Sequence, residues 1–382
     1  MRVAVLGSTG SIGLQALEEI QRFPGRFELV ALAAGRNVAL LAQQARTFGV
    51  RELCVAEEAD AVKLQKLVPG ARVRFGPQGL AELAALPHVD LVLNAVVGAV
   101  GIFPTLSALR AGKRLALANK ESLVVAGELV MQARQYPDQI VPVDSEHAAL
   151  WQLFQGVRRE EVARAWITAS GGPFRHRSEE ELKDVTPEEA LNHPTWRMGP
   201  RITVDSATLV NKAFEVIEAH HLFALPWDRI GVLLHPESKV HALLELVDGS
   251  ILAQLAYPDM RLPIRAALTY PERLPPAIPL PLAPLTLVFQ EVPRDRYPAF
   301  WLVLRAGQEG GTFPAVANAA DEVLVAAFLA KKIPFTAIAA GLEHVLSRHT
   351  RAGASSLEEV LVADRWAREE AERFVDGIFR GI

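Results

Sequence analysis

The sequence predicts an α/β protein whose N-terminal part is a parallel sheet covered by helices. Short apolar runs recur between residues 2 and 143, and segments with helical periodicity separate most of them. A glycine-rich turn follows the first of these runs. Strands that alternate with helices form parallel sheets, because each crossover helix returns the chain to the same edge. We therefore expect a Rossmann-like parallel sheet, then a central α+β domain and a C-terminal helical bundle.

The candidate strands of the first sheet are the apolar runs at residues 2–7, 27–34, 53–56, 73–75, 91–97, 115–118 and 140–143. A second group lies at 165–168, 229–234, 240–247 and 251–257, and Asp248-Gly249-Ser250 makes a hairpin of the last two. Residues 271–300 are rich in proline and cannot form one continuous helix. Helical periodicity returns near 315–331, 335–348 and 356–375.

These changes of pattern divide the chain into domains. A chain of 382 residues is too long for one ordinary core, so several domains are expected on length alone. We expect a dinucleotide-binding domain at residues 1–144 and a catalytic and dimerisation domain at 145–270. A proline-rich linker at 271–296 and a helical domain at 297–382 complete the prediction.

Composition narrows the class of protein. Lys and Arg total 40 against 44 Asp and Glu, a net charge of -4, so the chain lacks the basic excess typical of nucleic-acid binding. Cys54 is the only cysteine and lies in an apolar run, which favours a buried thiol over a nucleophile. No apolar run reaches membrane-spanning length, and the N-terminus has no signal-peptide pattern. We expect a cytoplasmic protein that makes no contact with membrane or nucleic acid.

The turn after the first strand has glycines at positions 7, 10 and 13 and leads into a helix. Glycines allow a tight turn, and the free amides at a helix start attract a pyrophosphate. The spacing is GxxGxxG rather than GxGxxG, so a plain strand-to-helix turn is the alternative. The second strand ends in Gly35-Arg36-Asn37. An arginine there suits the extra phosphate of NADP rather than the ribose of NAD, unless Arg36 is a solvated surface charge.

Polar residues follow the later strands of the first sheet: Asn94, Asn119-Lys120-Glu121 and Asp144-Ser145-Glu146. Ligands of parallel sheets bind beyond the carboxyl ends of the strands, so these residues are candidates for nicotinamide and substrate contacts. Helix capping would explain Asn119 equally well.

Asp144 and Glu146 are two residues apart and share one side of the chain if it stays extended. Two carboxylates so close repel each other unless a proton or a cation intervenes. Glu215, far along the sequence, is a candidate third oxygen donor to a hard divalent ion. The alternative is that Asp144 or Ser145 caps the helix that follows.

In the second half, Ser206 is expected to open a helix that contains Asn211, Lys212 and Glu215. Spacings of four and three residues place the amide and the ammonium near the Glu215 carboxylate. A hydroxyl at a helix start and a nearby lysine suit a phosphate group, and an ordinary solvated face is the alternative. The loop with Trp196 and Met198 is either a mobile lid or a loop pinned to the core.

Several longer motifs carry a family resemblance that covers nearly the whole chain. They are the glycine turn at 7–13, Ala118-Asn119-Lys120-Glu121, Val143 to His147, Ala169 to Phe174, His193 to Gly199, and Asp205 to Thr208 with Asn211-Lys212. With these motifs the sequence resembles the 1-deoxy-D-xylulose 5-phosphate reductoisomerases. These enzymes convert that sugar phosphate to 2-C-methyl-D-erythritol 4-phosphate in non-mevalonate isoprenoid biosynthesis, with NADPH and a divalent metal. Two departures from the family pattern are Arg201, where lysine is frequent, and Asp321, where asparagine is commoner.

The resemblance implies roles for named residues. Magnesium or manganese would be held by Asp144, Glu146 and Glu215, and Glu146 and Glu215 would also bind the substrate. Lys120 and Ser145 would contact the sugar, and the phosphate would be bound mostly by Ser170, His193, Ser206, Asn211 and Lys212. The implied catalytic set is Lys120, Asp144, Glu146, Glu215 and His193 with Trp196 and Met198 of a closing flap. The NADPH site would be lined by Thr9, Gly10, Ser11, Ile12, Gly35, Arg36, Asn37, Asn119, Glu121 and Gly199. The family architecture implies a homodimer.

Two other functions remain open at this point. A different NADP-dependent dehydrogenase would share the first domain but would not need three carboxylates. A non-catalytic NADP sensor would explain the first 140 residues and leave Asp144, Glu146 and Glu215 without a role.

Overall fold

The computed structural model describes residues 1–196, 198–276 and 279–380 and forms two compact units. The first comprises Met1–Ser122, Leu129–Trp151 and a segment that begins at Asp259. The second comprises Leu123–Glu128, Gln152–Pro258 and the chain from Pro279 on. The expected domain boundaries at 144, 270 and 296 stay a prediction.

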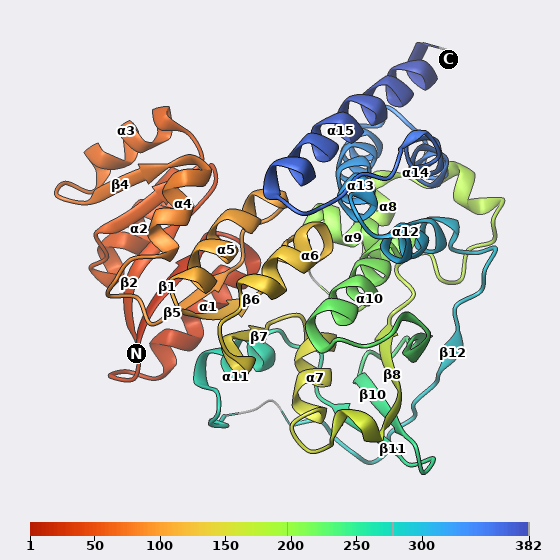
Figure 1. The fold of residues 1–382 in the computed structure, drawn as a ribbon, viewed down its shortest axis with the longest axis horizontal. Coiled ribbons are helices and arrows are strands. Elements are labelled where there is room, and N and C mark those ends of the chain that lie inside the picture. The colour runs from red at the N-terminus through yellow and green to blue at the C-terminus, as the bar shows by residue number, and fades with distance from the viewer. Residues whose placement is uncertain (197, 277–278, 381–382) are drawn as a thin grey trace. The chain divides into compact units, whose positions relative to one another are not determined.

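The first unit is built on a seven-stranded parallel sheet in the order β4-β3-β2-β1-β5-β6-β7 (Figure 1). Its strands are β1 (Arg2–Leu6), β2 (Glu28–Ala33), β3 (Glu52–Val55), β4 (Arg72–Phe75), β5 (Leu91–Asn94), β6 (Arg114–Leu117) and β7 (Ile140–Pro142). Each overlaps one of the apolar runs predicted from the sequence, so the predicted parallel sheet is confirmed.

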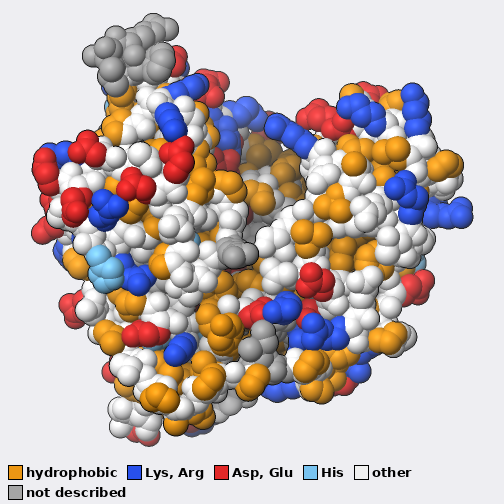
Figure 2. Space-filling model, turned by 180° about the vertical axis from the view of Figure 1, so that it is seen from behind, with side chains coloured by type: hydrophobic (Ala, Val, Ile, Leu, Met, Phe, Trp, Pro, Cys, Tyr) orange, Lys and Arg blue, Asp and Glu red, His pale blue; other side chains and the backbone are white. Residues whose placement is uncertain are grey.

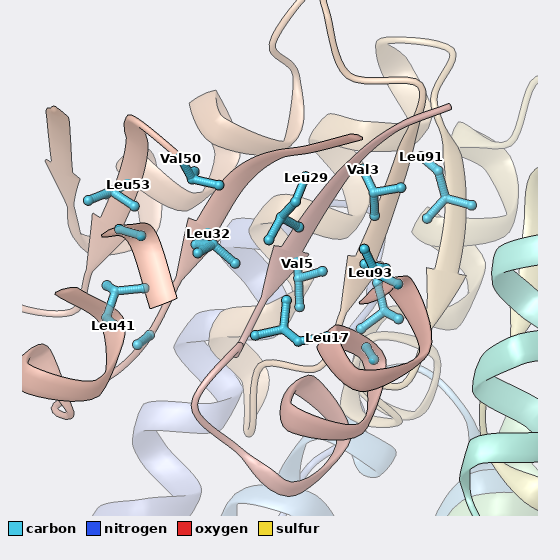
Figure 3. Close-up of a cluster of buried hydrophobic side chains, with 14 of the residues drawn as sticks. Val3, Val5, Leu17, Leu29, Leu32, Leu41, Val50, Leu53, Leu91 and Leu93 are labelled. Carbon is cyan, nitrogen blue, oxygen red and sulfur yellow. The ribbon is translucent and has the colours of Figure 1, made fainter. Parts of the chain in front are cut away.

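The helices that connect these strands are α1 (Ser11–Arg22), α2 (Val38–Phe48), α3 (Glu58–Leu67), α4 (Gly76–Ala84), α5 (Ile102–Arg110) and α6 (Glu121–Ala133), and α7 (Ser145–Leu153) follows the last strand. The core of the unit lies between sheet and helices. Figure 3 shows Val3, Val5 and Leu32 of the strands beside Leu17 of α1, and all four are at most 5% exposed. Burial of such side chains contributes roughly 1.5–3 kcal/mol each, which explains why the strand positions follow the apolar pattern.

A helix from late in the sequence, α11 (Arg261–Thr269), also belongs to the first unit, where it packs against α1. Arg265 of α11 donates to the carboxylate of Glu19, with 2.7 Å between Nε and Oε2, and both side chains are buried. A buried charge is costly unless it is paired, so this contact specifies where α11 docks. The sequence interpretation did not anticipate this helix.

The second unit contains a mixed five-stranded sheet in the order β11-β10-β8-β9-β12. Its strands are β8 (Val162–Ala169), β9 (Ile230–Leu234), β10 (Val240–Leu246), β11 (Ile251–Leu255) and β12 (Gln290–Glu291). β8 and β9 are parallel, and the other pairs are antiparallel. The predicted hairpin of β10 and β11 is confirmed. The short β12 comes from the proline-rich stretch and pairs with β9.

Helices complete the second unit: α8 (Pro187–Ala190), α9 (Pro200–Thr208), α10 (Val210–Phe223), α12 (Pro298–Glu309), α13 (Phe313–Leu329), α14 (Ala337–Arg348) and α15 (Leu357–Arg380). The last three match the predicted C-terminal helices, whereas α12 was not foreseen. Within the described part of the chain, no helix has both the length and the hydropathy that a membrane span requires. Basic and acidic side chains are mixed over the face drawn in Figure 2, as their near balance in the sequence leads one to expect.

Candidate active site

The glycine turn of the first unit forms an open cradle at the N-terminus of α1. Gly7 has a φ of +84°, and a Cβ there would lie 2.4 Å from the carbonyl oxygen of Ala95. A Cβ on Gly13 would lie 2.2 Å from the oxygen of Gly7, so the turn and the helix touch through backbone alone. Gly10 is the N-cap of α1, and no side chain caps this helix. Its first amides therefore face outward as donors for an anion.

Seven of the ten expected NADPH residues lie in this turn, at the start of α1 or after the neighbouring strand β2. Gly10 and Ser11 are exposed, and Thr9 and Ile12 are half-buried. Because β1 and β2 are neighbours, the end of β2 lies at the same edge. There Gly35, Arg36 and Asn37 are exposed, and Asn37 caps α2 by accepting from the amide of Leu40 at 3.2 Å. The outward amides of α1 and the exposed Arg36 thus lie on the same side of the sheet, and their contacts with the cofactor stay a prediction.

Asn94 at the end of β5 and Asn119 after β6 make hydrogen bonds that stabilise neighbouring loops. Asn94 is fully buried, and its amide donates to Gly101 O and Thr105 Oγ1, both at 2.9 Å. The Asn119 amide donates to Val96 O and Gly98 O, at 2.8 and 3.0 Å. Asn94 is therefore a poor candidate for the ligand contact that the sequence suggested.

Glu121 completes this arrangement by accepting from Gly98 N at 2.9 Å and from the Asn119 amide at 2.9 Å. These bonds shape the loop after β5, which lies at the edge of the sheet where the cofactor is expected. The cofactor contacts of Asn119 and Glu121 stay predictions.

Asp144 lies at the carboxyl end of β7 and caps α7. Its Oδ1 accepts from the backbone amides of Glu146 and His147, at 3.1 and 3.3 Å. The capping alternative is thus confirmed. Because α7 begins at Ser145, the chain is not extended here, and the expectation that Asp144 and Glu146 share one side of a strand is wrong.

Two basic side chains contact the Asp144 carboxylate within the first unit. Lys120 Nζ lies 2.9 Å from Oδ2, and His147 Nδ1 lies 2.8 Å from Oδ1. His147 is fully buried, whereas Lys120 and Asp144 keep 12% and 14% of their side chains exposed. Ser145 Oγ donates to Glu146 Oε2 at 2.9 Å. The ends of the neighbouring strands β6 and β7 therefore bring together a lysine, a serine and two carboxylates.

A second cluster, within the second unit, centres on His193. Its Nδ1 accepts from the backbone amides of Thr195 and Trp196, at 3.1 and 2.9 Å. Its Nε2 lies 3.1 Å from Ser170 Oγ and 3.3 Å from Ser206 Oγ. Burial, and next the charge of Arg175, lower the pKa of His193 to about 4. His193 is therefore a neutral imidazole whose Nε2–H faces two hydroxyl groups.

Ser206 occupies a different place in its helix from the one that the sequence predicted. It lies in the last turn of α9, so the expectation that it opens a helix is wrong. Leu209, which has a φ of 58°, separates α9 from α10. Because of this break, Ser206 and the start of α10 do not belong to one continuous helix.

The expected convergence at the start of α10 is confirmed. Asn211 Nδ2 donates to Glu215 Oε1 at 2.7 Å, and Lys212 Nζ contacts Glu215 Oε2. Lys212 and Glu215 are 5% and 1% exposed. A buried ammonium and a buried carboxylate stabilise each other, and an isolated one would be costly.

The expected flap residues lie between His193 and α9. The Trp196 ring lies 6.3 Å from the His241 ring, and Met198 is half-buried. Gly199 is the N-cap of α9 and accepts from Thr203 Oγ1 at 2.8 Å. Arg197 lies outside the described residues. A closing movement of this segment stays a prediction.

Sequence reasoning missed several side chains that surround these clusters. His147 is three residues after Asp144 at a helix start, so its spacing alone could have indicated the contact. Arg201 contacts Asp321 at 3.4 Å, so the two departures from the family pattern meet in space. Burial raises the pKa of the Asp321 carboxyl to about 6. A single sequence gives no signal that residues 201 and 321 are in contact.

Comparisons with known proteins agree with this arrangement. The family model for 1-deoxy-D-xylulose 5-phosphate reductoisomerase matches residues 3–127. Models for the C-terminal domains of the same family match residues 140–223 and 255–370. A curated reductoisomerase from Chlorobium chlorochromatii is 50% identical over 378 residues, which is 98% of this chain and 99% of the relative. One from Pelodictyon phaeoclathratiforme is 49% identical over the same length and the same shares.

Solved structures of this kind match along the whole fold. The reductoisomerase from Zymomonas mobilis in complex with NADPH has a TM-score of 0.90 and 42% identity, covering 98% of this chain and 99% of its own. A reductoisomerase in complex with NADPH, fosmidomycin and magnesium has a TM-score of 0.92 and 37% identity, covering 98% of both chains. The chain therefore belongs to the 1-deoxy-D-xylulose 5-phosphate reductoisomerase family.

Proposed function

We propose that this protein converts 1-deoxy-D-xylulose 5-phosphate to 2-C-methyl-D-erythritol 4-phosphate in isoprenoid biosynthesis, with NADPH and a divalent metal ion. It is an NADPH-dependent oxidoreductase. One observation carries the proposal: the chain matches, over 98% of both chains, a structure that holds NADPH, fosmidomycin and magnesium together. The two polar clusters of this chain supply the groups that such ligands need.

The first unit is proposed to bind NADPH, which supplies the hydride for the reduction. The fit rests on the uncapped N-terminus of α1, where a Cβ on Gly7 or Gly13 would collide with backbone. Amides there hold the pyrophosphate, and the exposed Arg36 binds the extra phosphate that distinguishes NADPH from NADH. The remaining proposed contacts are Thr9, Gly10, Ser11, Ile12, Gly35, Asn37, Asn119, Glu121 and Gly199.

Asp144, Glu146 and Glu215 are proposed to hold magnesium or manganese. The fit rests on the chemistry of the donors, since these carboxylates offer the oxygen ligands that hard divalent ions prefer. The ion would supply Lewis-acid stabilisation of negative charge on the substrate oxygens. Lys120, which contacts Asp144 at 2.9 Å, and Ser145 orient the sugar.

The second unit is proposed to bind the phosphate of the substrate. Ser170, His193 and Ser206 present hydroxyl and imidazole N–H groups, and Asn211 and Lys212 add an amide and a buried positive charge. Because His193 is neutral, this cluster binds through oriented hydrogen bonds, with Lys212 as its charge. Phosphate binding supplies remote binding energy that holds the reacting carbons in place. Trp196 and Met198 are proposed to exclude water when the loop closes.

The test is the loss of NADPH absorbance when 1-deoxy-D-xylulose 5-phosphate is added. We expect oxidation with manganese or magnesium present, no oxidation after chelation, and the branched polyol phosphate as product. Sugar without phosphate is the matched control and should react poorly. If pure folded protein binds NADPH but oxidises none of it under varied metals, the assignment is wrong.

We also propose that the protein is a cytoplasmic homodimer. Support for the dimer comes from β11, an edge strand whose Ile251 is 61% exposed, and from Val247, which is 68% exposed near the hairpin turn. Exposed apolar residues along a sheet edge mark an interaction surface. Light scattering should give about twice the 41.6 kDa of the single chain. A mass near the single-chain value at micromolar concentration would contradict the dimer.

A further inference from the structure

A tyrosine outside the proposed substrate contacts holds the loop that carries Ser170. Tyr297 directly precedes α12 and is 3% exposed. Its hydroxyl donates to the carbonyl oxygen of Gly171 at 3.1 Å. Burial raises the pKa of the Tyr297 phenol, so the hydroxyl keeps its proton at neutral pH. The neighbouring Arg296 donates to Phe174 O at 2.5 Å. Two consecutive residues before α12 therefore hold this loop by hydrogen bonds to its carbonyl groups.

The bond from Tyr297 fixes the orientation of a single peptide plane. The carbonyl of Gly171 and the N–H of Gly172 belong to the same peptide unit and point in opposite directions. The Gly172 N–H donates to Ser170 Oγ at 3.2 Å. Gly171 and Gly172 have φ values of +83° and +72°, and glycines rotate at little steric cost. Without a hold on the carbonyl, this plane is free to turn and withdraw the amide from Ser170.

The same bonds decide which way the Ser170 hydroxyl donates. Because His193 Nδ1 accepts two backbone amides, the ring proton is on Nε2, 3.1 Å from Ser170 Oγ. Ser170 Oγ thus accepts from Gly172 N–H and from His193 Nε2–H. Its own proton is left to donate outward. A phosphate oxygen only accepts hydrogen bonds, so a hydroxyl oriented as a donor matches it.

We propose that Tyr297 is a positioning residue for phosphate binding: it holds the Gly171–Gly172 peptide so that the Ser170 hydroxyl donates to the phosphate of the substrate. This inference rests on the proposed function, in which Ser170 is a phosphate ligand. Tyr297 itself acts only through the loop.

The test compares Tyr297→Phe, Ser170→Ala and the double variant with the wild type. Tyr270→Phe is the matched control, since its hydroxyl bonds to Asp138 at 3.1 Å within the first unit, whereas this loop belongs to the second. We expect Tyr297→Phe to raise the KM for the sugar phosphate about three- to tenfold, the effect of one net hydrogen bond. The KM for NADPH should not change. In the Ser170→Ala background the same substitution should have almost no further effect, because the hydroxyl that it orients is gone.

Calorimetric binding of 1-deoxy-D-xylulose 5-phosphate to the same four proteins and the control separates this inference from the proposed function. Binding and turnover by the wild type with an unchanged Kd for Tyr297→Phe would overturn the positioning role alone. Effects that add fully in the double variant would overturn it as well, since they would show that Tyr297 acts by general stability. A wild type that neither binds nor converts the sugar phosphate would overturn the proposed function and this inference together.

Discussion

Replacing Gly172 by alanine tests whether close backbone packing positions the loop after β8. The φ of Gly172 is +72°, and an added Cβ would lie 2.5 Å from Ser206 O and 2.7 Å from Ala207 Cα. Gly249 is the matched control, with a φ of +86° and open space around the position of a Cβ. Both substitutions strain the backbone, but only Gly172→Ala collides with α9.

The expected magnitudes follow from these distances. An L-residue in the left-handed region costs about 1–2 kcal/mol, and this cost applies to both variants. Ordinary contact begins at 3.4 Å, so the alanine at 172 must move relative to α9 by about 0.9 Å. Displacing a binding group by about 1 Å can lower turnover by about 10²-fold. We expect Gly172→Ala to lose about 100-fold in kcat/KM for the sugar phosphate and Gly249→Ala to keep nearly full activity.

Two measurements decide the outcome. Steady-state NADPH oxidation gives kcat/KM for the sugar phosphate and the KM for NADPH, which should stay unchanged in both variants. Thermal unfolding should show a decrease of about 2–4 °C for each kcal/mol of strain. If Gly172→Ala loses no more activity than Gly249→Ala, the argument from close packing is refuted.

Three further predictions concern the cofactor, the metal and pH. Arg36→Gln should raise the KM for NADPH about tenfold and leave the KM for NADH unchanged, because one charge-assisted contact is lost; equal changes for both would exclude a 2′-phosphate contact. Glu215→Gln should lower metal-dependent turnover by about 100-fold with little effect on NADPH affinity measured by fluorescence, and equal losses would count against metal binding. The folded pKa of His193, about 4, is below its ordinary 6.5, so the unfolded chain binds the proton first. The contribution of His193 to the free energy of unfolding should be full above pH 6.5 and decrease toward pH 4, by less than about 1.4 kcal/mol per pH unit because the group is partly exposed. Chemical unfolding of His193→Gln should show a smaller decrease over this pH range. An identical decrease would refute the assignment.

The sheet of the first unit was predictable because its signal is local. Strands buried on both faces read as continuous apolar runs, and the helices between them repeat their apolar residues every three or four positions. The convergence of Asn211 and Lys212 on Glu215 was predictable for the same reason, since neighbours on one helix turn meet wherever the helix lies. The elements that escaped prediction include α8, α9, α11, α12 and β12, most of which lie in or beside irregular or proline-rich stretches.

The clusters around His193 and Asp144 were only partly predictable. Their residue types were visible in the motifs, but the break at Leu209 overrode the helix expected from Ser206 onward. Asp144 likewise caps α7, so the chain is helical rather than extended from Ser145 on, and the carboxylates of Asp144 and Glu146 do not lie on one side of a strand. In both places a local conformation competed with the regular pattern, and the contacts of the folded chain decided between them.

By itself, the sequence determined the fold class, the approximate strand positions and the family, because apolar periodicity and motif spacing are properties of neighbouring residues. Tertiary structure alone decided which side chains from distant segments meet. It joined Ser170, His193 and Ser206, docked Arg265 of α11 on Glu19, and placed the Tyr297 hydroxyl on the Gly171 carbonyl. These contacts join segments far apart in the chain, and their geometry depends on packing that no short stretch of sequence encodes.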